Sequence, residues 1–208
     1  MSVQSKQEEL LNSWSHGLGT ILGIVGLIFL ITGVDSSKPW YLLSVVIYGI
    51  SIIILFAAST AYHAVSKYDL KKKFRIVDHI SIYLLIAGTY TPVLLITLSN
   101  SLGWQLFYAV WGIALFGVIL KLFFTGRFEI FSTLLYLVMG WLIVFDFSTL
   151  SEIMHPNGIL WLFAGGMFYT VGIIFYTIHK IPFNHVIWHF FVLAGAICHF
   201  FMIYEYVI

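Results

Sequence analysis

The sequence predicts an all-α integral membrane protein, a bundle of seven transmembrane helices. Of its 208 residues, 61% are hydrophobic and only 9% are charged, and the mean hydropathy is +0.99. A soluble domain of this size carries roughly 25% charged residues. The apolar residues form continuous runs instead of alternating with polar ones, which favours helices over a membrane β-barrel. We therefore expect one seven-helix membrane domain over residues 1–208.

Composition also limits the function and the processing of the chain. The net charge of +1 gives no reason to expect a nucleic-acid partner. The only cysteine, Cys198, has no partner for an intrachain disulfide. Residues 1–13 are polar and lack the basic start, apolar core and cleavage site of a signal peptide, so no removable signal is predicted.

Seven apolar runs are each long enough to cross a bilayer as a helix, which takes about 20 residues for a hydrocarbon core about 30 Å thick. The breaks that end the first six runs are, in order, "DSSKP", "SKYDLKKKFR", "SNSLG", "TGR", "HPNG" and "HKIPFN". Each break contains turn residues or a group of charges. The expected helices lie near residues 16–34, 40–65, 78–98, 104–124, 129–150, 158–178 and 185–206.

The lysine and arginine residues predict how the helices are oriented in the membrane. Cytoplasmic loops carry an excess of these residues. With the N-terminus in the cytoplasm, only Lys38 falls on the outer side. Lys121 lies in the last turn of its helix and can extend to the inner face. The inner side then receives Lys6, Lys67, Lys71, Lys72, Lys73, Arg75, Lys121, Arg127 and Lys180. We therefore expect a cytoplasmic N-terminus and an outer C-terminus.

This topology brings five polar residues to one level of the bundle. The second helix ends at the cytoplasmic side with Ser59 and His63, and the third helix begins there with Asp78. The seventh helix also begins there, with His185 and His189. Residues four apart lie on one helix face, with about 5–6 Å between their Cβ atoms, so the last two histidines can face the same point.

These residue types suit a zinc site. Three neutral imidazoles, here His63, His185 and His189, together with one open position are typical of catalytic zinc. Asp78 can accept a hydrogen bond from a water molecule at the metal or orient a histidine ligand. Ser59 can do the same, or donate to a developing oxyanion. A carboxylate near the membrane core is costly and tends to mark function.

Each of these features also has a structural interpretation. Paired histidines on a membrane helix often form hydrogen bonds between helices. Asp78 can instead pair with Arg75 or a nearby lysine, and Ser59 can be a small residue that permits close helix packing. His199 follows His189 by ten residues, roughly 15 Å deeper in the bilayer. We expect His199 to form a buried interhelical hydrogen bond and not to bind the metal.

Three further polar residues are expected to have other roles. His16 lies at the inner end of the first helix, either near the site or at the membrane interface. His79 points about 100° away from its neighbour on an ideal helix, which favours helix packing or headgroup contact. Asp146 is expected at the outer membrane interface.

The ordered motifs resemble the bacterial hemolysin III family. They are "SHGLG" opening the first helix, Ser59 and His63 ending the second, Asp78 opening the third, and the H-x-x-x-H of the seventh with a following "CHF". The resemblance covers essentially the whole chain. That family belongs with the progestin and adipoQ receptors, and more distantly with alkaline ceramidases.

The resemblance implies a multi-pass protein of the bacterial plasma membrane with zinc near the cytoplasmic side. Its ligands would be His63, His185 and His189, with Asp78 and Ser59 beside a water molecule at the metal. Few residues precede the first expected helix, so we do not expect the long N-terminal cytoplasmic domain of the adiponectin receptors or the hormone reception that goes with it.

Three functions follow as alternatives, each with membrane lipids as partner. The first is a zinc-dependent hydrolase of a lipid amide or ester, similar to a ceramidase. The second is a non-enzymatic sensor or regulator of membrane lipid state, in which zinc clamps the second and seventh helices. The third, suggested by the family name, is a cytolytic pore-former. It ranks lowest, because the sequence has no secretion signal and no amphipathic pore-lining stripe.

Overall fold

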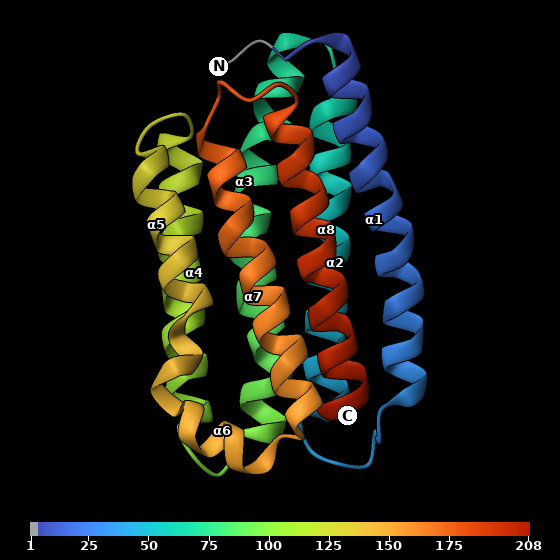
Figure 1. Cartoon of the computed structure of the whole chain (residues 1–208), viewed down its shortest axis with the longest axis vertical. Coiled ribbons are helices and arrows are strands. Elements are labelled where there is room, and N and C mark those ends of the chain that lie inside the picture. Colours follow the sequence, from blue (N-terminus) through green and yellow to red (C-terminus); the bar gives the residue numbers. More distant parts are fainter. Residues whose placement is uncertain (1–3) are drawn as a thin grey trace.

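The chain is an all-helical bundle in the computed structural model, which describes residues 4–208 (Figure 1). Seven helices in this range are long and apolar enough to cross a membrane, and the range contains no strand. The predicted fold class is therefore confirmed. The spans are α1 (Lys6–Gly33), α2 (Tyr41–Ala64), α3 (Tyr68–Pro92) with η1 (Val93–Thr97), α4 (Gly103–Phe124), α5 (Glu129–Gly140) with η2 (Leu142–Asp146) and α6 (Phe147–Ile153), α7 (Pro156–Thr177) and α8 (Asn184–Tyr206).

Two helices begin well before the predicted residues. α1 starts at Lys6, where a capping box closes its first turn. The Ser5 side chain accepts a hydrogen bond from the Glu8 amide at 3.2 Å, and the Glu8 carboxylate accepts one from the Ser5 amide at 2.7 Å. α3 starts at Tyr68, so the lysine-rich segment predicted as a break is helical. Both errors have one cause. The predicted starts were placed where the sequence becomes apolar, but lysine and glutamate are good helix formers, so each helix begins earlier, in its polar segment.

The fifth span is irregular, and a tyrosine from a neighbouring helix satisfies its backbone. α5 ends at Gly140, and the chain continues through the 3₁₀ turn η2. The Tyr90 hydroxyl donates to the Gly140 carbonyl at 2.8 Å and accepts from the Ile143 amide at 3.0 Å. Inside a bilayer such freed backbone groups need protein partners, because no water is present to bond them.

The most buried spans are α2, α3 and α8, which form the inner part of the bundle. α1 lies along α2 and α8, while α4 and α5 lie on the opposite side (Figure 1). Large apolar side chains of the outer helices, such as Ile28 and Phe123, are exposed, as expected for helices that face lipid. The three inner helices are the ones that carry the predicted site residues.

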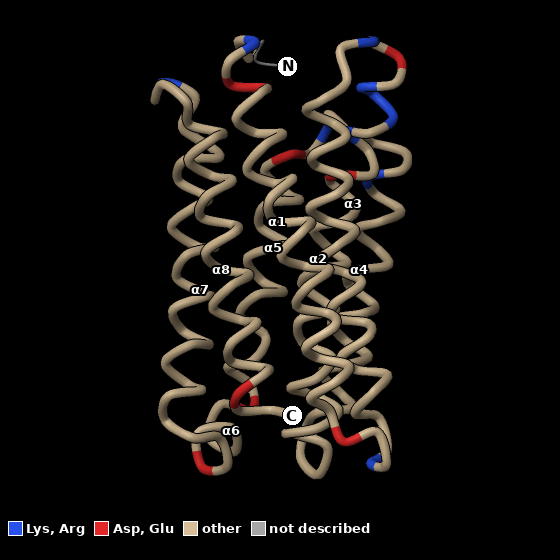
Figure 2. The backbone as a smooth tube through the Cα atoms, turned by 90° about the vertical axis from the view of Figure 1, so that its right-hand side faces the viewer, with Lys and Arg blue, Asp and Glu red and all other residues tan. Residues whose placement is uncertain are grey.

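Lysine and arginine residues gather at the end of the bundle that carries the N-terminus (Figure 2). This end, which includes Lys67–Arg75, Arg127 and Lys180, is called the basic end below. Lys38 lies at the other end, where the chain finishes. The two ends therefore differ in charge as the sequence predicted, and which of them faces the cytoplasm remains a prediction.

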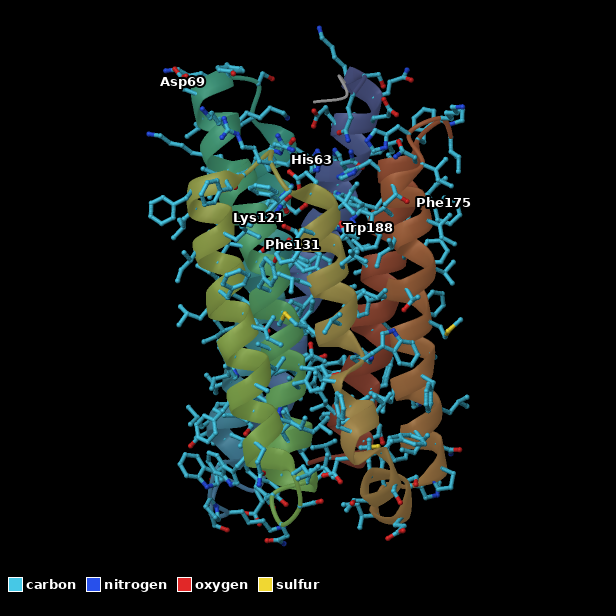
Figure 3. All side chains as sticks on the ribbon, turned by 90° about the vertical axis from the view of Figure 1, so that its left-hand side faces the viewer. His63, Asp69, Lys121, Phe131, Phe175 and Trp188 are labelled. Carbon is cyan, nitrogen blue, oxygen red and sulfur yellow. The ribbon has the colours of Figure 1, made fainter. Side chains whose placement is uncertain are left out.

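The prediction that Lys121 extends to the membrane surface is wrong. Its side chain is 1% exposed and donates a hydrogen bond to the Glu129 carboxylate at 2.8 Å, inside the bundle near the basic end (Figure 3). Arg75 donates to the same carboxylate at 3.2 Å, so it pairs with Glu129 and not with Asp78. A buried cation is tolerated when it is paired. Glu129 lies on α5, close to Lys121 in the sequence but far from Arg75.

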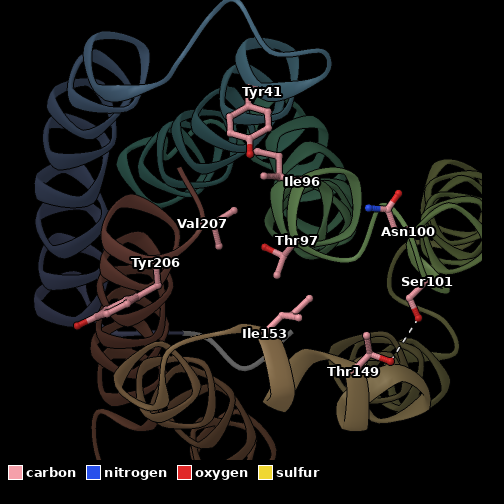
Figure 4. A pocket seen from close by; sticks show the side chains of 9 residues that line it. All are labelled: Tyr41, Ile96, Thr97, Asn100, Ser101, Thr149, Ile153, Tyr206 and Val207. Carbon is pink, nitrogen blue, oxygen red and sulfur yellow. Dashed lines mark hydrogen bonds between the residues drawn. The ribbon is translucent and has the colours of Figure 1, made fainter.

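Asp146 was expected at the membrane interface but lies buried, 5% exposed, near the end opposite the basic end. Its carboxylate accepts hydrogen bonds from the Ser101 hydroxyl and the Leu102 amide, both at 2.9 Å. These bonds fix the turn that leads into α4. The same turn borders a cavity of about 430 Å³ lined by Tyr41, Ile96, Thr97, Asn100, Ser101, Thr149, Ile153, Tyr206 and Val207 (Figure 4).

Replacing Asp146 with alanine is expected to destabilise the protein without affecting any metal. The change leaves the Leu102 amide and the Ser101 hydroxyl without their charged acceptor, which costs about 1–3 kcal/mol. A lower midpoint of thermal unfolding in detergent, with unchanged zinc content, would match this role. Glu152, an exposed acid on α6, provides the control, and its change to alanine should leave the midpoint unaltered.

Candidate metal centre

Three histidines from two helices converge near the basic end. His63 lies in the last turn of α2, and His185 and His189 lie in the first two turns of α8. One ring nitrogen of each lies within 4.8 Å of the others. The ring centroids of His63 are 5.2 and 4.9 Å from those of His185 and His189, which are 4.7 Å from each other. The structure thus brings together the three residues predicted as ligands.

Glycines on α1 hold that helix close against α2 beside the histidines. A Cβ atom added to Gly19 would lie 2.6 Å from the Phe56 ring, and one added to Gly23 would lie 2.9 Å from Ile52. Small residues at such positions let two membrane helices approach closely. Consequently the polar first turns of α1 also lie at the site. The sequence had assigned site residues only to α2, α3 and α8.

The polar turns of α1 supply hydrogen-bond partners that the sequence did not indicate. The His63 Nδ1 donates to the Glu9 carboxylate at 2.8 Å. The His189 Nδ1 donates to the Asn12 carbonyl at 3.3 Å and lies 3.4 Å from the Ser15 hydroxyl. No motif or spacing pointed to Glu9 or Asn12, because an acid in the first turn of a helix is an ordinary feature.

His16 belongs to the site and not to the membrane interface, the two places that the sequence left open. Its ring stacks on that of His189 with centroids 3.6 Å apart and planes inclined by 11°. The Phe56 ring packs nearly perpendicular to the His16 ring, with centroids 4.9 Å apart. Neither ring nitrogen of His16 has a hydrogen-bond partner among the described residues, although the side chain is buried. His16 therefore covers one side of His189.

Asp78 and Ser59 lie beside the histidine cluster. The buried Ser59 hydroxyl is close enough to interact with the half-buried Asp78 carboxylate, which also lies near His63. Asp78 is not among the residues whose ligand atoms fall within the shared 4.8 Å. Its position is therefore that of a neighbour of the cluster, as the sequence predicted, and not that of a fourth ligand.

The other two histidines within the spans, His79 and His199, lie outside the cluster. His199 donates from Nε2 to the Leu162 carbonyl of α7 at 3.2 Å, which confirms the predicted interhelical hydrogen bond. His79 is buried with its Nδ1 3.6 Å from the Glu129 carboxylate, so it packs within the bundle and does not reach headgroups. These two imidazoles therefore have partners of their own, apart from the cluster.

The histidine cluster fits a metal ion in its donor chemistry. With Nδ1 of His63 and His189 engaged in donating a proton, the lone pair of each ring lies on Nε2. The Nε2 of His63 is buried and has no hydrogen-bond partner among residues 4–208. A buried polar atom without a partner is costly, and a metal ion at the cluster would satisfy it. Three nitrogen donors match the ligand set of catalytic zinc.

Known proteins with similar sequences come from bacteria and animals. A family model described as haemolysin-III related matches residues 4–200. The chain is 46% identical to Hemolysin-3 of Bacillus cereus, with 99% of this chain and 94% of the relative covered. It is 43% identical to the Hemolysin-3 homolog of Bacillus subtilis (strain 168), covering 96% and 94%. The human monocyte to macrophage differentiation factor is 29% identical, covering 96% and 84%. The chain therefore belongs to the haemolysin-III family of multi-pass membrane proteins.

Proposed function

We propose that this protein is a zinc-dependent hydrolase that cleaves an amide or ester bond of a membrane lipid. The observation that carries the proposal is the cluster of His63, His185 and His189, in which a buried His63 nitrogen has no protein partner and Asp78 lies alongside. Ligands of this kind with an adjacent carboxylate are the usual components of a hydrolytic zinc site.

The residues around the cluster have complementary roles in this proposal. Zn²⁺ bound by the three histidines would polarise the scissile carbonyl and make a water molecule more acidic. Asp78 takes up the proton of the attacking water and returns it to the leaving amine or alcohol. Ser59 lies beside Asp78, and its single hydroxyl proton can turn from that carboxylate to the carbonyl oxygen of the substrate once Asp78 has taken up a proton.

A lipid is the substrate class that the surroundings of the cluster favour. The site lies on spans α2 and α8 near one end of the bundle, and the outer faces of the neighbouring helices are apolar. A lipid acyl chain can lie against these faces while its polar linkage reaches the site. Nine of the ten lysine and arginine residues lie toward the same end, and we propose that this end faces the cytoplasm.

Replacing Asp78 with asparagine is expected to abolish lipid hydrolysis while zinc stays bound. The amide keeps the size of the side chain but cannot accept the proton, and loss of a general base lowers kcat by about 10²–10⁴-fold. The measurement is fatty-acid release from ceramides and phospholipids by the zinc-loaded protein in detergent. Asp69, exposed in the first turn of α3, gives the matched control, and its asparagine variant should retain full activity.

A second function, the zinc-clamped lipid sensor, is favoured by the position of the ligands. A metal at the cluster joins α2 to α8. These two spans are far apart in the sequence, and both contact α1. Full zinc occupancy with no release from any lipid tested would refute the hydrolase and favour this sensor. The name of the Bacillus relatives suggests cytolysis, which would appear instead as dye leakage from liposomes after the protein is added from outside.

A further inference from the structure

A carboxylate on α1 is hydrogen-bonded to one histidine of the cluster. The Glu9 Oε2 accepts the hydrogen bond from the His63 Nδ1 at 2.8 Å, and its Oε1 lies 3.0 Å from the Lys71 Nζ. The His63 side chain is 0% exposed, whereas that of Glu9 is 24% exposed. Three residues from α1, α2 and α3 therefore form a continuous chain of contacts that ends at the histidine cluster.

Lys71 fixes the position of the carboxylate. Its ammonium donates to the Tyr62 carbonyl at 3.1 Å and to the Val65 carbonyl at 3.4 Å, and it lies 4.6 Å from the centre of the Tyr62 ring. Both carbonyls lie at the end of α2, where no further helical amide is available to bond them. The ammonium thus has acceptors on several sides, which leaves it little freedom to move away from Glu9.

The contact between Glu9 and His63 determines which ring nitrogen is free. A carboxylate accepts hydrogen bonds, so the shared proton is on the His63 Nδ1 and the lone pair is on Nε2. That Nε2 is the buried atom without a partner. In metal sites a carboxylate behind a histidine fixes the tautomer and orientation of the ring and raises its basicity.

The other two histidines have no carboxylate in this role. The His189 Nδ1 bonds a backbone carbonyl, that of Asn12, and His185 has no hydrogen bond among the described residues. Glu9 is thus the one charged group in the described chain that is hydrogen-bonded to a member of the cluster. Its effect should therefore be specific to His63.

We propose that Glu9, held by Lys71, is a positioning residue that sets the affinity of the histidine cluster for its metal. This inference rests on the metal site of the proposed function and does not depend on catalysis. It assigns a role to the polar N-terminal turns of α1, which carry none of the three ligands. It also explains why α1 begins outside the apolar run with a well-formed capping box, because that cap fixes the turn that carries Glu9.

The test compares the zinc affinity of two neighbouring glutamine variants of the full-length protein. Competition with a chromophoric zinc chelator gives each dissociation constant. Glu9→Gln is expected to weaken zinc binding by about 10–100-fold, the usual effect of altering the hydrogen-bond partner of a metal ligand, because the amide is neutral and only its oxygen can accept. Glu8→Gln is the control, because glutamine also completes the capping box at that position, and its affinity should equal that of the unmutated protein.

Two further measurements separate positioning from a purely structural role. The thermal midpoint of the metal-free protein should be similar for both glutamine variants, whereas a structural role would lower it for Glu9→Gln alone. The absorption spectrum of the Co²⁺-loaded protein should change in Glu9→Gln and remain unchanged in Glu8→Gln. Glu9→Asp, which keeps the charge but shortens the side chain, should show intermediate zinc affinity and serves if Glu9→Gln does not fold.

Three outcomes would overturn the inference. Equal zinc affinity for Glu9→Gln and the unmutated protein removes the role of Glu9 while leaving the metal site intact. A metal-free thermal midpoint that is lowered in Glu9→Gln alone, together with an unchanged Co²⁺ spectrum, shows that the role of Glu9 is purely structural. Absence of zinc from the unmutated protein, prepared without chelator, refutes the metal site itself and the positioning role with it.

Discussion

Replacing His185 and His189 together with alanine is expected to remove zinc from the purified protein, from about one ion per chain to a trace, because one remaining imidazole cannot hold the metal. The two side chains supply two of the three nitrogens that lie within 4.8 Å of one another. Elemental analysis of detergent-purified protein, prepared without chelators, measures the content directly.

His199→Gln is the matched control for this change. It lies on the same helix, and the glutamine amide can still donate to the Leu162 carbonyl, so zinc content should be unaffected. Added zinc should also raise the thermal midpoint of the unmutated protein and of the control, because a ligand that binds only the folded state stabilises it. Zinc retained in full by the double variant would place the ion elsewhere in the chain and contradict the site.

Replacing Gly103 with alanine is expected to cause the largest loss of stability among the single changes considered. A Cβ atom at this position would lie 2.5 Å from the Leu98 carbonyl oxygen and would also collide with the Leu94 carbonyl. Both are backbone atoms of the segment that leads into α4, so no side-chain rotation relieves the overlap. We expect a loss of about 3 kcal/mol, at the upper end of the usual cost of overpacking. Thermal unfolding in detergent measures it.

Gly112 provides the comparison, because it lies on the same helix with no atom within 4 Å of an added Cβ. Gly112→Ala should be neutral or stabilise the protein by up to about 1 kcal/mol, since alanine is the better helix former. Equal unfolding midpoints for the two alanine variants would show that the turn before α4 can rearrange, against the expectation from its geometry.

The seven spans could be predicted because the bilayer sets a simple requirement. A segment that crosses hydrocarbon must be apolar for about 20 residues and must satisfy its own backbone, which leaves continuous hydrophobic helices as the solution. The starts of α1 and α3 were wrong because their first turns are polar and lie beyond that requirement. The break at Gly140 was also missed, since its freed backbone groups are bonded by Tyr90 from another helix.

The positions of the three histidines followed from spacing and topology. His185 and His189 share a helix face, and the even number of spans between the end of α2 and the start of α8 brings all three to the same end of the bundle. The placement of Lys121 did not follow, because a lysine at a helix end can either extend to the surface or pair inside. Its partner, Glu129, was available only through the packing of α5 against α4.

The sequence by itself determined the helical class, the number of spans, the charge difference between the two ends and the level of the histidines. All of these depend on local composition and on the alternation of direction from one span to the next. Only the tertiary structure decided that Glu9 supports His63, that His16 stacks on His189 and that Asp146 is buried. These contacts join residues far apart in the chain, and they arise from the close approach of helices at Gly19 and Gly23 and from turns whose partners no local pattern identifies.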